Sequence, residues 1–399
     1  MKLVVQKFGG SCLASPQRIL SVADRIAATR KSGTQVIAVV SAMGGTTDRL
    51  LALAKEISAE PQKRELDMLL TAGERISMAL LSMAINSMGW GAISFTGSQS
   101  GIITDDGHGE ASIVDVKAHR IRDEIDRGRI VIVAGFQGVS LTKEVTTLGR
   151  GGSDLTAVRL AAAFAAERCE LYKDVAGVFT ADPRIVPGAR RIGRLSYDEL
   201  VELIGAGSQV VQDRAVLAAK RYQVPLHIKS GFSETEGTMV TREPATGEIG
   251  ARGVGMRKGV CRITVETSDP AREGATRILA ALASARIPVH LAGAALERGD
   301  SKGLTIVVDS DQAKRAREVI EITGTAKAVL EDEMSLVSLV GHRVSSPDLA
   351  AKALADLIEG DVPVKGVCST PTSLTCITTP EKTEDAVRAL HKRIEAEEG

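Results

Sequence analysis

Short apolar runs rich in β-branched residues alternate with amphipathic stretches through residues 1–240. The runs are KLVVQKF, TQVIAVVSA, RIVIVAGF, CELYKDV and VPLHIKS. Nearly continuous apolar runs of this length are typical of parallel strands that are covered on both faces. Between them, PQRILSVADRIAATRKSG has Pro near its start and Gly at its end, as many helices do. The alternation predicts an α/β domain with a mostly parallel sheet sandwiched by helices.

The composition of the sequence changes after this alternation. The stretch TREPATGEIGARGVG is rich in Gly, Pro and charge, which predicts a linker. Two units of roughly 75 residues follow, and each has the order βαββαβ of a ferredoxin-like module. We therefore expect a catalytic α/β domain, a linker and two modules suited to small-molecule sensing or dimerisation, with the bounds 1–245, 246–258, 259–332 and 333–399.

The overall charge and composition exclude several classes of partner. Lys plus Arg and Asp plus Glu number 50 each, and aromatic residues make up only 3% of the 399 residues. Neither a basic field nor a set of stacking platforms for nucleic acid is therefore expected. The five cysteines are scattered, and the first residues enter a strand-like segment without a signal-peptide core. With every apolar run shorter than a membrane span, we expect a cytoplasmic protein with no membrane partner.

A glycine-rich stretch, TLGRGGSDLTAVRLAAAF, follows one apolar run and opens a helical pattern. Backbone N–H groups of 149–152 at the start of a helix would suit an anion. A dinucleotide-binding fingerprint would need glycine at 154, where Asp154 stands, and a carboxylate would repel a pyrophosphate unless a metal intervened. No Gly-Lys-Ser/Thr follows, so the stretch is not a P-loop. A phosphate site and a ligand-free turn with a helix cap both stay open on this evidence.

Four further motifs carry polar residues at or near the ends of predicted strands. They are KFGGSC with Lys7, SAMGGTTDRLL with Ser41, Thr46 and Thr47, LLTAGERIS with Glu74 and Arg75, and YKDVAGVFTADPRIVPGARRI with Asp174, Asp182 and Arg184. Each has an ordinary structural alternative: a turn with a solvent-facing lysine, a helix cap, a solvated helix face, or a surface loop with internal salt bridges. The strongest of them fall at carboxyl ends of strands of one sheet, which is where α/β proteins bind ligands.

In order along the chain, these motifs, with SFTGSQSGIIT and IVAGFQGV, resemble those of the aspartate kinases of the amino acid kinase family. The resemblance covers residues 1–245 closely, and the two terminal modules resemble the paired ACT regulatory domains of these enzymes. It implies an amino acid kinase fold, ATP and Mg²⁺ as cofactors, and aspartate as the acceptor. Since the nucleophile is then an ionised carboxylate, no general base is needed.

The resemblance also implies roles for individual residues. Lys7, Arg150 and Asp154 would be catalytic, with Lys7 neutralising the transferring phosphoryl group and Asp154 orienting Lys7. Arg150 would grip a substrate carboxylate bidentately and Glu74 would hold the ammonium group. The amino acid would contact Ser41, Thr47, Glu74, Phe136, Arg150, Gly152 and Ser153. ATP would contact Lys7, Gly9, Gly10, Ser11, Lys173, Asp174, Phe179, Asp182, Arg184 and Gln209. Mg²⁺ would bridge the β- and γ-phosphates, and no side chain is predicted as its ligand.

The sequence departs from the family pattern at several positions. Cys12 stands where the family has a second hydroxyl residue, Lys173 where it has Ser or Thr, and Gln209 where it has a nucleotide-contacting lysine. These three departures concern the affinity for ATP and the base that is preferred. In the first module, Ala294 and Ala295 replace a Gln-Asn pair of the effector site. Without those amides we expect weak or absent feedback inhibition by lysine or threonine.

The leading hypothesis is phosphorylation of L-aspartate to 4-phospho-L-aspartate, the first step of the aspartate-derived amino-acid pathway. One alternative is a specialised paralogue that phosphorylates a related amino acid. Another is a catalytically silent regulatory subunit, which would not need to keep Lys7, Arg150, Ser153, Asp154 and Asp174. Exposed edge strands of the modules favour a homo-oligomer through the terminal domains.

Overall fold

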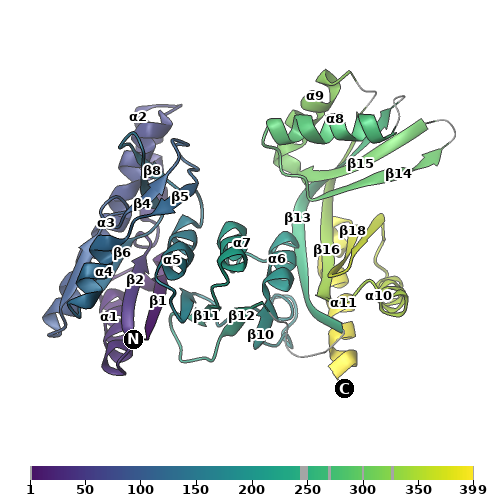
Figure 1. Ribbon diagram of the computed structural model, residues 1–399. Helices are drawn as coiled ribbons and strands as arrows, with labels where there is room; N and C mark the ends of the chain where they lie inside the picture. The colour runs from purple at the N-terminus through teal and green to yellow at the C-terminus, as the bar shows by residue number, and fades with distance from the viewer. Residues whose placement is uncertain (1, 243–249, 268–270, 299–300, 325–327, 399) are drawn as a thin grey trace. The chain divides into compact units, whose positions relative to one another are not determined.

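The computed structural model describes residues 2–242, 250–267, 271–298, 301–324 and 328–398 (Figure 1). The chain forms two compact units. The first contains Met1–Val178, Arg191–Ile204 and Gln209–Gly247, and the second contains Phe179–Arg190, Gly205–Ser208 and Glu248–Gly399. Each unit has its own sheet and its own apolar core.

The first unit is built on an eight-stranded sheet with the order β10-β12-β11-β9-β1-β2-β6-β3. All of its neighbouring strand pairs are parallel except β11 with β12. The strands are β1 (Leu3–Phe8), β2 (Gln35–Val40), β3 (Ala92–Phe95), β6 (Ile130–Ala134), β9 (Arg168–Lys173), β10 (Arg194–Ser196), β11 (Leu226–Ser230) and β12 (Thr238–Thr241). Every residue of β2 and β6 is buried, as their uninterrupted apolar sequences predicted.

Helices cover both faces of this sheet. Its helical elements are η1 (Gly10–Leu13), α1 (Pro16–Lys31), α2 (Thr46–Ile57), α3 (Lys63–Ser87), α4 (His119–Asp126), α5 (Gly152–Ala163), α6 (Tyr197–Gly205) and α7 (Asp213–Tyr222). Apolar side chains of α1 and α3 share one core with β1, β2 and β6, and α5 packs against β1 and β9. The predicted α/β architecture, a mostly parallel sheet between helices, is confirmed.

A smaller sheet of four strands has the order β5-β4-β7-β8. It consists of β4 (Ile102–Thr104), β5 (Ile113–Val116), β7 (Gln137–Ser140) and β8 (Val145–Thr147). Strand β8 leads directly into the glycine-rich stretch before α5. This small sheet therefore determines where that stretch begins.

Helix α3 has the length and composition of a membrane-spanning helix, with a mean hydropathy of 1.4 in its most apolar window. Within that window, 39% of the residues are buried in the fold, and core helices of soluble proteins pass the same test. Its buried residues include the acidic side chains of Asp67 and Glu74. The apolar character of α3 is therefore weak evidence for a membrane.

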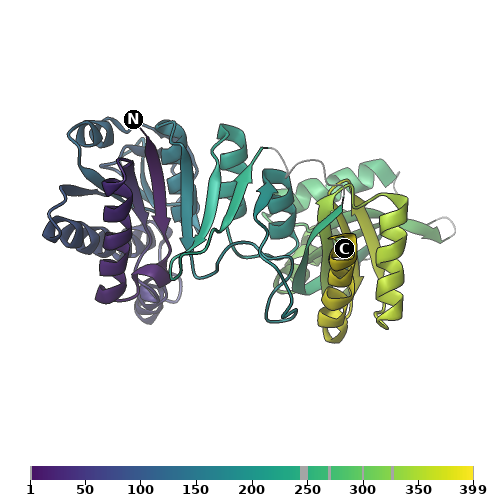
Figure 2. The same cartoon turned by 90° about the horizontal axis from the view of Figure 1, so that it is seen from below.

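The second unit contains a six-stranded antiparallel sheet with the order β14-β15-β13-β16-β18-β17. Its elements are β13 (Gly250–Thr267), α8 (Ala271–Ser284), β14 (Leu291–Arg298), β15 (Ser301–Asp309), η2 (Ser310–Gln312), α9 (Ala313–Ile322), β16 (Ala328–His342), α10 (Pro347–Glu359), β17 (Gly366–Thr370), β18 (Ser373–Thr378), η3 (Pro380–Lys382) and α11 (Thr383–Glu398). Figure 2 shows α10 and α11 side by side, and both contribute to one core. The two predicted ferredoxin-like modules are present.

The two modules share the long strands β13 and β16, which corrects the predicted linker. The first half of β13, Gly250 to Lys258, pairs with the second half of β16, and its second half pairs with the first half of β16. Residues 250–258 of the predicted linker 246–258 are therefore the fourth strand of the second module; the rest of that range lies outside the described residues. The predicted range 333–399 lacks this strand. Glycines caused the misassignment: at Gly255 an added Cβ would lie 2.4 Å from the Cβ of Ala206, so the strand needs glycine there.

The segment Phe179–Arg190 also differs from prediction, because it was placed in the domain 1–245. The structure groups it with the second unit. Ala181 and Ile185 are buried in the core formed by α10, α11 and the central strands of the second module. Thr180 accepts a hydrogen bond at its carbonyl from the N–H of Val254 (2.7 Å), and its hydroxyl lies 2.8 Å from Nε2 of the buried His391.

Candidate active site

The carboxyl ends of the central parallel strands meet at one edge of the large sheet. In the parallel register, Phe8 of β1 lies beside Val40 of β2 and beside Tyr172 of β9. The residues next to these positions, Lys7 and Lys173, therefore come from adjacent strands at the same edge. Helix α5 packs against β1 and β9. This arrangement brings three of the predicted motifs together.

Two lysines share the carboxylate of Asp154. Lys7 Nζ lies 2.7 Å from one oxygen of Asp154, and Lys173 Nζ lies 2.6 Å from the other. The Asp154 side chain is 1% exposed, and those of Lys7 and Lys173 are 6% and 17% exposed. The cluster carries one net positive charge in a largely dry place, which favours an anion as its ligand.

The charges of this cluster are coupled. Burial alone would raise the pKa of Asp154, but the two ammonium groups outweigh burial and hold that pKa at about 2. Burial and the charge of Lys7 lower the pKa of Lys173, while Asp154 opposes both effects. Asp154 is therefore ionised at neutral pH and holds both cations in fixed positions.

Two glycine turns lie beside the cluster. After β1, Gly9 donates its N–H to the carbonyl of Tyr172 (3.2 Å), and an added Cβ on Gly10 would lie 2.9 Å from the carbonyl oxygen of Ala42. Ser11, half-buried, follows in η1. Larger residues could not bring the backbone so close to the loop that follows β2. The close approach leaves backbone amides near Lys7, as a phosphate site requires.

The second glycine turn precedes α5. Gly149 and Gly151 have φ angles of 76° and 68°, in the left-handed region that favours glycine. Asp154 lies in the first turn of α5, so the predicted helix start is confirmed. Ser153 is buried and close to β6, because an added Cβ on Gly135 would lie 2.7 Å from its Cβ. Between the two left-handed glycines, Arg150 is exposed to solvent.

Glu74 lies in α3 with its carboxylate buried. Its Oε1 accepts a hydrogen bond from the N–H of Ala42 (3.0 Å), and its buried Oε2 has no hydrogen-bond partner in the part of the chain that the structure describes. Burial raises the pKa of Glu74 to about 7, and the Ala42 N–H and the charge of Lys7 oppose it only in part. A buried carboxylate oxygen without a partner costs free energy, and a bound cationic group would remove that cost.

The remaining predicted amino-acid contacts lie on neighbouring loops. Ser41 is half-buried and donates its N–H to the Phe8 carbonyl (3.2 Å). Thr47 is half-buried in the first turn of α2, where Thr46 is buried. Phe136 has a φ of 68° and donates its N–H to the Thr156 hydroxyl (3.2 Å). Gly152 begins α5.

The other predicted nucleotide contacts are exposed or belong to the second unit. Asp174 and Gln209 are exposed. Phe179, Asp182 and Arg184 belong to the second unit, where Asp182 and Arg184 form an ion pair with each other (2.6 Å). This pair is the internal salt bridge that the sequence left open as an alternative. Arg75 is exposed, whereas its neighbour Glu74 faces inward.

Four residues that hold the loops of the site, Asp67, His108, Gln212 and Arg214, were not predicted from the sequence. Buried Asp67 of α3 accepts from the Thr147 hydroxyl (2.5 Å) and lies 2.7 Å from His108 Nδ1. Gln212 and Arg214 at the start of α7 donate to carbonyls of the glycine-rich stretch. One signal was present: Asp67 precedes Glu74 by two helical turns and therefore lies on the same face of α3.

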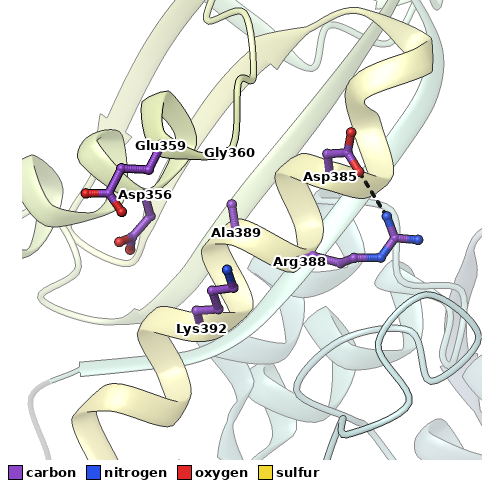
Figure 3. A pocket seen from close by; sticks show the side chains of 7 residues that line it. All are labelled: Asp356, Glu359, Gly360, Asp385, Arg388, Ala389 and Lys392. Carbon is purple, nitrogen blue, oxygen red and sulfur yellow. Dashed lines mark hydrogen bonds and ion pairs between the residues drawn. The ribbon is translucent and has the colours of Figure 1, made fainter.

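A separate cavity of about 440 Å³ lies in the second unit, between α10 and α11 (Figure 3). Its wall carries charges of both signs, from Asp356, Glu359, Asp385, Arg388 and Lys392. Arg388 pairs with Asp385 (3.0 Å). None of the predicted site residues lines this cavity.

The comparisons with known proteins agree with this fold. The model of the amino acid kinase family matches residues 2–230, and the chain belongs to that family. Over its whole length it is similar to an aspartokinase of Corynebacterium glutamicum, at 42% identity over 99% of this chain and 96% of the relative. It is 40% identical to aspartokinase 2 of Bacillus subtilis, over 99% of this chain and 98% of the relative. The fold matches E. coli aspartokinase III in complex with aspartate and ADP, with a TM-score of 0.84, 23% identity and coverage of 99% and 100%.

Proposed function

We propose that the protein phosphorylates the side-chain carboxylate of L-aspartate with ATP and releases 4-phospho-L-aspartate and ADP. The observation that carries the proposal is the Lys7–Asp154–Lys173 cluster at the carboxyl edge of the sheet. The full-length similarity to aspartokinases supports aspartate as the acceptor.

The phosphates of ATP would bind at the two lysines and the glycine turn after β1. Lys7 and Lys173 keep their ammonium groups beside Asp154 and can place further N–H donors on phosphate oxygens. Gly10 and Ser11 would offer backbone amides, and Gly9, whose own N–H is donated to the Tyr172 carbonyl, would let the backbone come close to the phosphates. Asp174, Phe179, Asp182, Arg184 and Gln209 stay proposed nucleotide contacts on the strength of the resemblance alone.

Aspartate would bind between Glu74 and Arg150. The unpartnered oxygen of Glu74 would accept from the substrate's ammonium group, and exposed Arg150 would grip a carboxylate with two parallel hydrogen bonds. Ser41, Thr47, Phe136, Gly152 and Ser153 would complete the site. The side-chain carboxylate would then face the γ-phosphorus of ATP.

The reaction needs no proton transfer. A carboxylate oxygen of aspartate attacks the γ-phosphorus, a new P–O bond forms, and the bond to the β–γ bridging oxygen breaks with its electron pair leaving on ADP. Lys7 stabilises the charge on the transferring group. When bound, Mg²⁺ would supply further charge neutralisation on the phosphates. The described residues contain no group of three or more His, Cys, Asp or Glu placed to hold a metal ion. Arrival of Mg²⁺ with the nucleotide, bound to its phosphates, is part of the proposal.

Two further features complete the proposal. β14 and β17 are the edges of the six-stranded sheet, and unpaired edges favour a homo-oligomer through the ferredoxin-like modules. All five cysteines are free, which supports a reducing, cytoplasmic location.

Ala294 and Ala295 lie on β14, and their side chains are outside the described part of the structure, so weak feedback inhibition remains a prediction.

Trapping with hydroxylamine tests the proposed activity. Purified protein is incubated with ATP, Mg²⁺ and one amino acid at a time from an acidic panel, and the acyl hydroxamate is measured. We expect hydroxamate with L-aspartate at a rate well above that with the other amino acids. A stronger signal with another acid would favour the specialised paralogue, and no signal with any acid would favour the silent subunit.

A further inference from the structure

The local sequence around Arg150 does not by itself hold the backbone in one conformation. Gly149 and Gly151 on either side both adopt left-handed conformations, and glycine gives a chain more freedom than any other residue. Arg150 is exposed and, among the described residues, its guanidinium has no recorded hydrogen bond or ion pair. An arginine that must meet a carboxylate in a planar, two-bond geometry needs a fixed starting point. That starting point has to come from outside the loop.

The start of α7 supplies contacts to this loop. Gln212 donates its side-chain N–H to the carbonyl of Arg150 (2.6 Å). The side chain of Gln212 also packs on Gly151, because an added Cβ on Gly151 would lie 1.7 Å from Gln212 Cγ. Helices α5 and α7 lie against each other, and Figure 1 shows them as neighbours. The peptide unit that carries Arg150 is therefore attached to α7.

Arg214 makes the second attachment. Its Nη1 donates to the carbonyl of Leu148 (2.8 Å), and its Nη2 donates to the carbonyl of Ala111 (3.0 Å). One rigid guanidinium thus joins the glycine-rich loop to the loop before β5. Leu148 is fully buried and donates its own N–H to the Phe136 carbonyl (2.9 Å).

We propose that Gln212 and Arg214 are positioning residues that fix the Arg150 loop for binding of the amino-acid substrate. The inference rests on the proposed function, since it takes Arg150 as the group that grips the substrate's carboxylate. Neither residue touches the reacting atoms in this assignment. Both act through backbone carbonyls, so their loss changes the placement of Arg150 and leaves the Lys7–Asp154–Lys173 cluster in place.

The test compares Arg214→Met, Arg214→Lys and Gln212→Ala with the unaltered protein. KM for aspartate and KM for ATP are each measured by hydroxamate trapping with the other substrate saturating. Arg214→Met is expected to raise KM for aspartate at least tenfold and KM for ATP less than twofold. Arg214→Lys, which can keep one of the two carbonyl contacts, should recover part of the loss. Gln212→Ala should raise KM for aspartate about threefold.

Arg221→Met is the matched control. Arg221 is exposed on the same helix and its recorded contact is with the ring of Tyr222, so this substitution should change neither KM. Equal rises in both KM values, or no change with Arg214→Met and Gln212→Ala, would overturn the positioning role. If Arg214→Met fails to fold, Gln212→Ala decides alone. A failure of the unaltered protein to phosphorylate any amino acid would instead overturn the proposed function.

Discussion

Asp154 joins two cations that come from different strands. Each of its oxygens lies within ion-pair distance of one lysine, and the three side chains are largely buried. Removing Asp154 would leave two buried ammonium groups without a counter-charge, which is strongly destabilising. Removing one lysine leaves the other ion pair intact. The lysines are therefore the better positions for mutational tests of catalysis.

Lys7→Met is expected to lower kcat by at least about 100-fold, because the transferring phosphoryl group loses a preorganised cation. The fold should survive, since Lys173 still pairs with Asp154. Steady-state kinetics and circular dichroism measure the two effects. Lys220→Met is the control. Lys220 lies on α7 and forms an exposed ion pair with Asp198 of α6, so this variant should retain full activity. A folded Lys7→Met protein with unchanged kcat would contradict the assigned role.

Glu74 is expected to make the affinity for aspartate depend on pH. Its pKa of about 7 means that the carboxylate is mostly protonated at pH 6 and mostly charged at pH 8. Since only the charged form pairs with an ammonium group, KM for aspartate should rise about tenfold from pH 8 to pH 6. Glu74→Gln should abolish this dependence and raise KM throughout. A KM profile that is flat for the unaltered protein would contradict the role of Glu74.

The same group affects the stability of the unliganded protein. The pKa of Glu74 in the folded protein lies above its ordinary value of 4.5. Its contribution to stability is therefore fully present below that ordinary value and is lost as pH rises through about 7. The ammonium group of bound aspartate would offset this loss of stability by pairing with the charged Glu74 carboxylate.

At the scale of elements, the sequence predicted the strands and the ends of strands better than it predicted pairings between distant segments. Lys7 and Asp154 could be chosen because a strand end and a helix start are local patterns. Lys173 was predicted as a nucleotide contact, but its ion pair with Asp154 depends on the packing of α5 against β9. Residues 250–258 have a glycine-rich sequence that is typical of a linker, and only pairing with β16 makes them a strand.

The segment Phe179–Arg190 gives a prediction at this scale. Ile185 is buried in the core of the second unit, while Ile192, seven residues further on, is equally buried and belongs to the first. Ile185→Ala should destabilise the second unit by about 2–4 kcal/mol, and Ile192→Ala should destabilise the first by a similar amount. Hydrogen exchange of peptides from β16 and from β2 measures the two units separately. Loss of protection in β2 upon Ile185→Ala would contradict the assignment.

At the scale of the whole molecule, the chain joins a kinase fold to a pair of ferredoxin-like modules. Residues 179–190 and 205–208 leave the first unit and return to it, so the two units are connected by more than one crossing of the chain. The alternation of apolar runs and amphipathic stretches predicted the first part, and the repeat predicted the second. These crossings of the chain could not be predicted from the sequence. They depend on the core in which residues such as Ala181 and Ile185 are buried.

The first ferredoxin-like module carries a prediction about regulation. With Ala294 and Ala295 in place of amide side chains, lysine and threonine at millimolar concentration are expected to inhibit the activity by less than half. Activity is measured with each amino acid alone and with both together. Ala294→Gln with Ala295→Asn is the matched gain-of-inhibition variant. Strong inhibition of the unaltered protein by either amino acid would refute the expectation.

In the proposed reaction, a carboxylate oxygen of aspartate attacks the γ-phosphorus of ATP directly. Aspartate labelled with ¹⁸O in its side-chain carboxylate, followed by hydroxylamine trapping, tests it most directly, because hydroxylamine cleaves the acyl C–O bond and releases phosphate with the bridging oxygen. Mass spectrometry of that phosphate should find one ¹⁸O atom for each molecule of hydroxamate formed. Phosphate without ¹⁸O would mean that water, and not the carboxylate, accepts the phosphoryl group, and it would contradict direct attack by aspartate.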